Sequence, residues 1–181
     1  MKLLVAGLLA IALVGCSPEV PPAEPEPQPT VDKPVEPEPP KSAVYDQLHS
    51  ALFQADAALS KVREALDALQ QVQSKNPPEI AEDLKDMAAT LDDTGATLAD
   101  RVGEELPPIE EVAKDEPKFK GKVTELRGMI DDVLVDLREQ EGVAASLVEM
   151  GPAETAKDFG KIDELLNQAI DELVGAKKTL D

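Results

Sequence analysis

The chain has 181 residues, of which 37 are acidic and 18 are basic, so its formal net charge is −19 at pH 7. A surface this acidic repels phosphate backbones and anionic headgroups, which argues against binding of DNA, RNA or a lipid surface through charge. A basic partner protein or divalent cations would be attracted instead. The simplest interpretation is that the carboxylates lie on solvated helix faces and keep the protein in solution.

The chain begins with a basic residue, an apolar run and its one cysteine. Lys2 is followed by small or apolar residues at positions 3–15, and Cys16 comes next. An apolar run of about 12 residues is too short to cross ~30 Å of hydrocarbon and is typical of the central part of a signal peptide. No other stretch is both long and apolar enough to cross a membrane.

The string Leu13-Val14-Gly15-Cys16 resembles the lipobox of bacterial lipoproteins, in which Leu precedes small residues and an invariant Cys. The resemblance implies that residues 1–15 are removed and that Cys16 is acylated, with chains such as palmitate, and anchored in the lipid bilayer. The mature chain would then have no thiol for a disulfide. Two or three acyl chains anchor stably where one binds only marginally. An ordinary secretory signal and an uncleaved helical anchor are the alternatives.

The residue after the cysteine bears on which membrane a lipoprotein reaches. In Gram-negative lipoproteins an Asp at this position commonly retains the protein at the inner membrane, and this chain has Ser17. The resemblance therefore implies the periplasmic face of the outer membrane. In a Gram-positive cell the same chain would lie on the outer face of the cell membrane, and the sequence leaves the choice open.

Residues 16–41 follow as a linker. Positions 18–40 contain ten Pro and five Glu, with almost nothing apolar to bury, so we expect disorder. Pro favours polyproline II at ~3.1 Å per residue, so the roughly 25 residues would reach at most about 75 Å. We interpret the segment as a spacer; a Pro-rich docking motif is the alternative.

From position 42 onward Pro becomes rare and helix-forming residues dominate. The six remaining prolines are Pro77, Pro78, Pro107, Pro108, Pro117 and Pro152. Pro is tolerated in the first turn of a helix and not in its interior. The predicted helices are therefore 42–75, 78–104, 117–149 and 153–180, and the segment 105–116 leaves room for one helical turn.

Each predicted helix has apolar residues spaced by three and four. The first also has a second apolar stripe, formed by Ala51, Ala58, Ala65 and Val72. A face this wide suits a helix with two neighbours, which favours a bundle over a two-stranded coiled coil. Short connections make neighbouring helices antiparallel. The sequence therefore predicts an all-α, up-down-up-down four-helix bundle over residues 42–181.

Several local features refine this prediction. Asn76 is positioned to cap the second helix, and Gly151 to close the third in a left-handed conformation. We expect Tyr45, Phe53 and Phe119 to meet as a small plug of core. Five glycines lie inside predicted helices, where close helix approach and plain tolerance both remain open. They are Gly95, Gly128, Gly142, Gly160 and Gly175.

We find no signature of catalysis or metal binding. His49 is the only histidine, with Asp46 three residues before it. A di-iron bundle needs two such motifs, and structural zinc needs Cys and His ligands that are missing. We expect His49 at the surface or its boundary. The acidic pairs lack EF-hand spacing, and no phosphate-binding loop or nucleophile with a base is present.

The sequence thus predicts a protein that is not an enzyme and has no cofactor. It would be a membrane-anchored lipoprotein that presents an acidic helical bundle as a structural or protein-interaction module of the cell envelope, with an envelope protein as partner. The alternative is an envelope binding protein for divalent cations or a small apolar ligand. The oligomeric state is left open.

Overall fold

The computed structural model of the chain describes residues 40–75 and 78–181. Within these residues every regular element is a helix and none is a strand, so the predicted all-α class is confirmed. The expected signal peptide (1–15), Cys16 and most of the expected linker (16–41) lie outside the described residues.

The described elements correspond closely to the predicted segments. In chain order they are α1 (Ala43–Ser74), the 3₁₀ helix η1 (Pro78–Ile80), α2 (Ala81–Val102), α3 (Ile109–Lys114), α4 (Glu116–Met150) and α5 (Ala156–Thr179). The short α3 lies where the sequence left room for one helical turn. The last helix begins three residues later than expected, because residues 153–155 form a turn.

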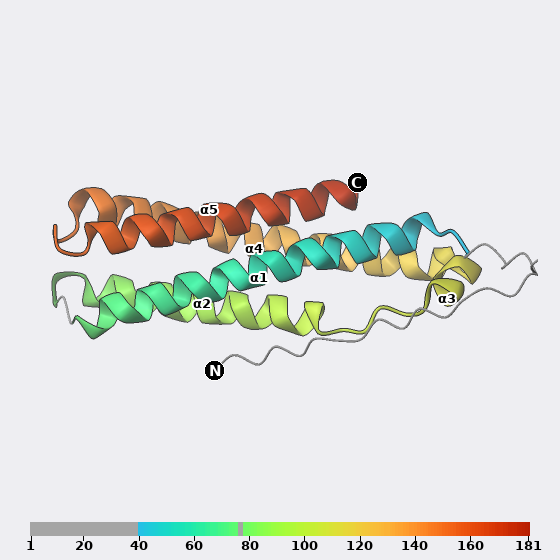
Figure 1. Ribbon diagram of the computed structural model, residues 1–181, viewed down its shortest axis with the longest axis horizontal. Helices are drawn as coiled ribbons and strands as arrows, with labels where there is room; N and C mark the ends of the chain where they lie inside the picture. The colour runs from blue at the N-terminus through green and yellow to red at the C-terminus, as the bar shows by residue number, and fades with distance from the viewer. Residues whose placement is uncertain (1–39, 76–77) are drawn as a thin grey trace, which may run out of the picture. The chain divides into compact units, whose positions relative to one another are not determined.

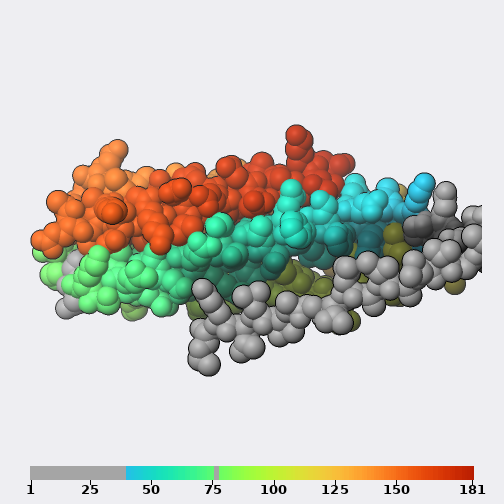
Figure 2. All heavy atoms as spheres, in the orientation of Figure 1, coloured from blue at the N-terminus to red at the C-terminus, as the bar shows by residue number. Residues whose placement is uncertain are grey.

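The four long helices lie side by side (Figure 1). The most extensive contact joins α1 to α5, followed by that between α4 and α5 and that between α1 and α2. Figure 2 shows α5, in orange and red, lying against α1 along the face in view. The contact between α2 and α4 is much smaller, and α3 touches α1 and α4. The helix pairs are therefore packed unequally, and α2 is the least embedded of the long helices.

One continuous apolar cluster includes residues from all five described α-helices. The apolar stripe predicted for the last helix is entirely buried: Phe159, Ile162, Leu166, Ala169, Leu173, Ala176 and Leu180. In α1 four of the fully buried positions are small, with Ala51, Ala55, Ala58 and Ala65 at 0 % exposure. Small side chains let helix backbones approach closely, which is consistent with the extensive contact between α1 and α5.

The helix ends partly follow the expectations. The hydroxyl of Ser42 accepts a hydrogen bond from the backbone N–H of Tyr45 at 3.1 Å and caps α1. The expected cap Asn76 lies outside the described residues. The left-handed conformation predicted for Gly151 is wrong: its φ of −74° and ψ of 176° are extended backbone. Its N–H still caps α4 by donating to the carbonyl of Leu147 at 3.0 Å, so the chain leaves the helix by straightening.

The predicted aromatic plug is wrong for one of its three members. Phe119 is buried and Tyr45 packs against the core, but Phe53 is 72 % exposed. An α-helix turns about 100° per residue, so Phe53 lies about 200° around α1 from Ala51 and from Ala55. Because both alanines are fully buried, Phe53 must face outward.

Thr94 in α2 is a buried polar residue whose hydroxyl oxygen forms no hydrogen bond with the described residues. Thr94 is only 2 % exposed. A buried hydroxyl left without a partner costs about 1–3 kcal/mol. We therefore expect Thr94→Val to raise the free energy of unfolding by about 1 kcal/mol, measured by denaturation followed by circular dichroism. Thr97→Val, at an exposed position of the same helix, is the matched control, and a destabilised Thr94→Val would contradict the assignment.

Candidate functional site

The candidate site lies where α2 ends before its neighbours do. Beyond Val102 the chain runs through residues 103–108 without regular structure, whereas α1 and α4 continue alongside (Figure 1). Gly103 disfavours helix, and Pro107 and Pro108 remove two backbone donors. An irregular segment therefore replaces a helix over this part of the core, and it covers less apolar surface than a helix would.

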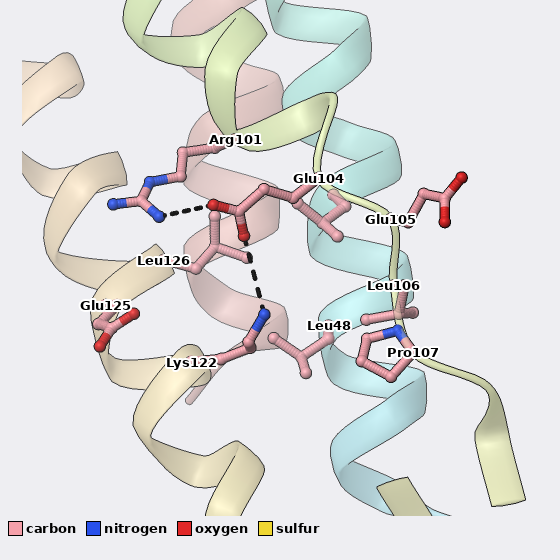
Figure 3. A pocket seen from close by; sticks show the side chains of 10 residues that line it. Leu48, Arg101, Glu104, Glu105, Leu106, Pro107, Lys122, Glu125 and Leu126 are labelled. Carbon is pink, nitrogen blue, oxygen red and sulfur yellow. Dashed lines mark hydrogen bonds and ion pairs between the residues drawn. The ribbon is translucent and has the colours of Figure 1, made fainter. Parts of the chain in front are cut away.

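A small hollow results between α1, the segment after α2, and α4. Its apolar lining comes from Leu48 and Leu52 of α1, from Leu106 and Pro107, and from Leu126 of α4. Figure 3 shows the side chains of Leu48, Leu106 and Pro107 facing one another across it. The cavity volume is about 40 Å³. This is room for a few water molecules or the end of one apolar side chain, and it is far below the several hundred Å³ of a typical metabolite pocket.

Charged side chains surround this hollow. A carboxylate oxygen of Glu104 accepts a hydrogen bond from Arg101 at 2.9 Å, and the other lies 3.8 Å from the amine of Lys122 (Figure 3). All three side chains are more than a third exposed, so these ion pairs add little stability. Glu105 and Glu125 also line the hollow, and neither forms an ion pair within the described part of the chain.

A second, more open hollow lies beside the first. Its volume is about 300 Å³, and it is lined by His49, Leu52, Phe53, Asp56, Val102 and Leu106. Leu52 and Leu106 line both hollows, so the two lie next to each other and are taken together as one surface. We call this surface the α2-end groove. Phe53 is its most exposed apolar residue and the one exposed Phe or Tyr side chain in the described residues.

His49 stands at the edge of this groove and is exposed, as the sequence predicted. Its ring stacks on that of Tyr45, with 5.9 Å between the centroids and 16° between the planes. Asp46 is likewise exposed. Across residues 40–75 and 78–181, no three Asp, Glu, His or Cys side chains are grouped so that they could hold a metal ion.

Chemically, the groove offers contact surface. It contains apolar side chains, carboxylates at its rim, and the basic side chains of Arg101 and Lys122, which both pair with Glu104. No Ser, Thr or Cys lines it. Cys16 is the one functional residue predicted from the sequence. It lies outside the described residues, so its acylation stays a prediction. Among the described helices, none is long and apolar enough to cross a membrane.

Sequence reasoning missed the α2-end groove, although two signals pointed to it. Phe53 is a large apolar residue outside both apolar stripes of its helix, and Leu106 is followed directly by two prolines. An apolar residue away from the core face and a helix stopped early together mark a surface that the described residues leave open.

Comparisons with known proteins add no relative. No family model matches the chain, and the searches of curated proteins and of solved structures found no match.

Proposed function

We propose that this chain is a bacterial lipoprotein, anchored through acylated Cys16, that serves as a non-enzymatic interaction or structural module of the cell envelope. The lipobox string supports the anchor. An acidic, all-helical body with an open apolar groove supports the module. Residues 1–15 are the cleaved signal peptide, residues 16–41 the lipidated cysteine and spacer, and residues 42–181 the body.

We further propose that the body is an up-down-up-down four-helix bundle into which α3 is inserted. The pattern of helix contacts supports this. Both α1 and α4 pack on α2 and on α5, whereas within the described chain α2 and α5 do not touch. In a bundle whose helices follow one another around a ring, α2 and α5 lie on one diagonal and α1 and α4 on the other. Among the described residues the α2–α5 diagonal is open, and the contact between α1 and α4 is smaller than any contact between ring neighbours. The chain direction also reverses from α1 to α2 and from α4 to α5 (Figure 1).

The α2-end groove carries the proposal of an interaction module. It is the place where the described body leaves a ring and several aliphatic side chains open to solvent together. Apolar patches of this kind, rimmed by polar groups, are typical of protein-interaction sites. With Ser17 after the cysteine, we place the protein on the periplasmic face of the outer membrane in a Gram-negative cell, and otherwise on the outer face of the cell membrane.

The anchor is tested by metabolic labelling with a clickable fatty acid. We expect the wild-type chain to be labelled and to sediment with membranes. In Cys16→Ser the label should disappear completely, because a hydroxyl cannot form the thioether to the lipid. Ser17→Ala is the matched control and should keep the label. A wild-type chain without label, or a labelled Cys16→Ser variant, would contradict the anchor. Proximity labelling from the chain in intact cells would then identify the envelope partner.

A further inference from the structure

We propose that the α2-end groove binds a short amphipathic segment of a partner protein, apolar on one side and flanked by Lys or Arg. This rests on the proposed function as an interaction module and specifies the surface and the chemistry of the partner. Three features of the described residues carry it: an apolar strip that they leave partly exposed, cavity sizes that suit side chains, and a rim with acids that they leave unpaired.

The apolar strip runs across three elements. Phe53 and Leu52 come from α1, Val102 from the end of α2, and Leu106 from the segment after it. Phe53 is 72 % exposed, and the other three are only partly buried. A contact that buried them would remove apolar area from water, at about 25 cal/mol per Å² before the costs of association. Binding energy at interfaces is concentrated in a few large side chains that become fully desolvated, and Phe53 is the side chain of the strip with the most apolar surface left to bury.

The dimensions fit side chains better than a metabolite. The smaller hollow next to Leu48 and Leu126 has about 40 Å³, and the more open one next to Phe53 has about 300 Å³. A metabolite site encloses most of its ligand, which neither hollow does. A peptide needs only shallow contact along its length and one deeper hollow for an anchor side chain, and the two adjacent hollows provide both.

The rim gives the sign of the partner's charge. Arg101 and Lys122 are both engaged by Glu104. Asp56, Glu105 and Glu125 line the hollows and form no ion pair within the described residues. A partner segment with Lys or Arg on its flanks would pair with these three carboxylates.

The same charges disfavour other occupants. A second copy of a chain with net charge −19 would bring its own carboxylates against them, and like charges brought together at an interface are costly. An anionic membrane surface would be repelled for the same reason. We therefore infer a basic protein segment, and the second copy and the membrane become outcomes of the test.

The test uses the full acylated chain in zwitterionic nanodiscs and a short synthetic helix of Leu and Lys with one Trp. The chain has no Trp of its own, so a blue shift of the peptide fluorescence beyond that seen with empty nanodiscs reports burial of the peptide against the chain. We expect saturable binding that Phe53→Ser weakens by about tenfold, equal to about 1.4 kcal/mol. Val135→Ser removes an apolar side chain that is 64 % exposed on α4 and should leave the affinity unchanged.

The charge is tested separately. We expect the triple variant Asp56→Asn, Glu105→Gln and Glu125→Gln to weaken binding and flatten its salt dependence, and a Leu and Glu peptide not to bind. Equal losses in Phe53→Ser and Val135→Ser would overturn the groove as the site. So would a chain that dimerises through Phe53, or that prefers anionic vesicles. If the acylated wild-type chain captures an envelope partner through a surface that contains Val135, the groove assignment fails and the proposed function stands.

Discussion

Phe159→Ala should lower the free energy of unfolding by about 3–5 kcal/mol, the usual cost of removing a buried aromatic ring. Phe159 is 0 % exposed and is the largest fully buried side chain of the described core. It lies in the first turns of α5, the helix that packs against both α1 and α4. A cavity there would weaken two helix contacts at once. Urea denaturation of the full chain, followed by circular dichroism, measures the loss.

Phe53→Ala is the matched control, because it removes the same ring from a position that is 72 % exposed. Surface substitutions usually change stability by no more than about 0.5 kcal/mol. The two variants should therefore differ by at least about 2.5 kcal/mol. Equal losses would mean that Phe53 is packed in solution, and the open groove would then be wrong.

The second large effect concerns Gly128 inside α4 and Gly151 directly after its end. Substitution by alanine should change the free energy of unfolding in opposite directions at the two positions. At Gly151 an added Cβ would lie against the carbonyl of Leu147, closer than atoms can approach without backbone movement. We expect Gly151→Ala to lower the free energy of unfolding by more than about 1 kcal/mol. An unchanged free energy of unfolding in Gly151→Ala would mean that the backbone after α4 can adopt a different conformation at little cost.

Gly128→Ala is the partner substitution. Gly128 lies inside α4, is exposed, and has no heavy atom within 4 Å of an added Cβ. Ala is favoured over Gly in a helix interior by about 0.5–1 kcal/mol, so this variant should be more stable than wild type by that amount. The same denaturation experiment measures both variants, and a destabilised Gly128→Ala would indicate that this face of α4 is covered in solution.

The helices were predictable because their signals are local. Apolar residues spaced by three and four fix which face of each helix is buried, and prolines mark where helices end. Thr94, Leu98 and the whole stripe of α5 are buried as this pattern requires. The outward position of Phe53 was also within reach, because it follows from helix periodicity alone. The expected aromatic plug considered only which residues share an end of the domain.

The groove and the exit from α4 depend on information that the local pattern does not contain. Whether Leu52 is covered depends on where α2 ends against α1, which is set by the register between helices. Glycine tolerates both left-handed and extended backbone, so the conformation of Gly151 is decided by the path to α5. For the groove and for the exit from α4, the sequence indicates which residues are unusual, but only the packing of the helices decides which of them are exposed and which backbone conformation they adopt.

The central claim is that the membrane-held chain works by binding a protein through the α2-end groove. Photo-crosslinking in the cells that naturally carry the gene tests it most directly, with p-benzoylphenylalanine in place of Phe53 in one strain and of Val135 in another. We predict one discrete crosslinked product from position 53, in the membrane fraction, whose partner has a basic, amphipathic segment at the point of attachment. No product from position 53, or the same products from both positions, would contradict the account.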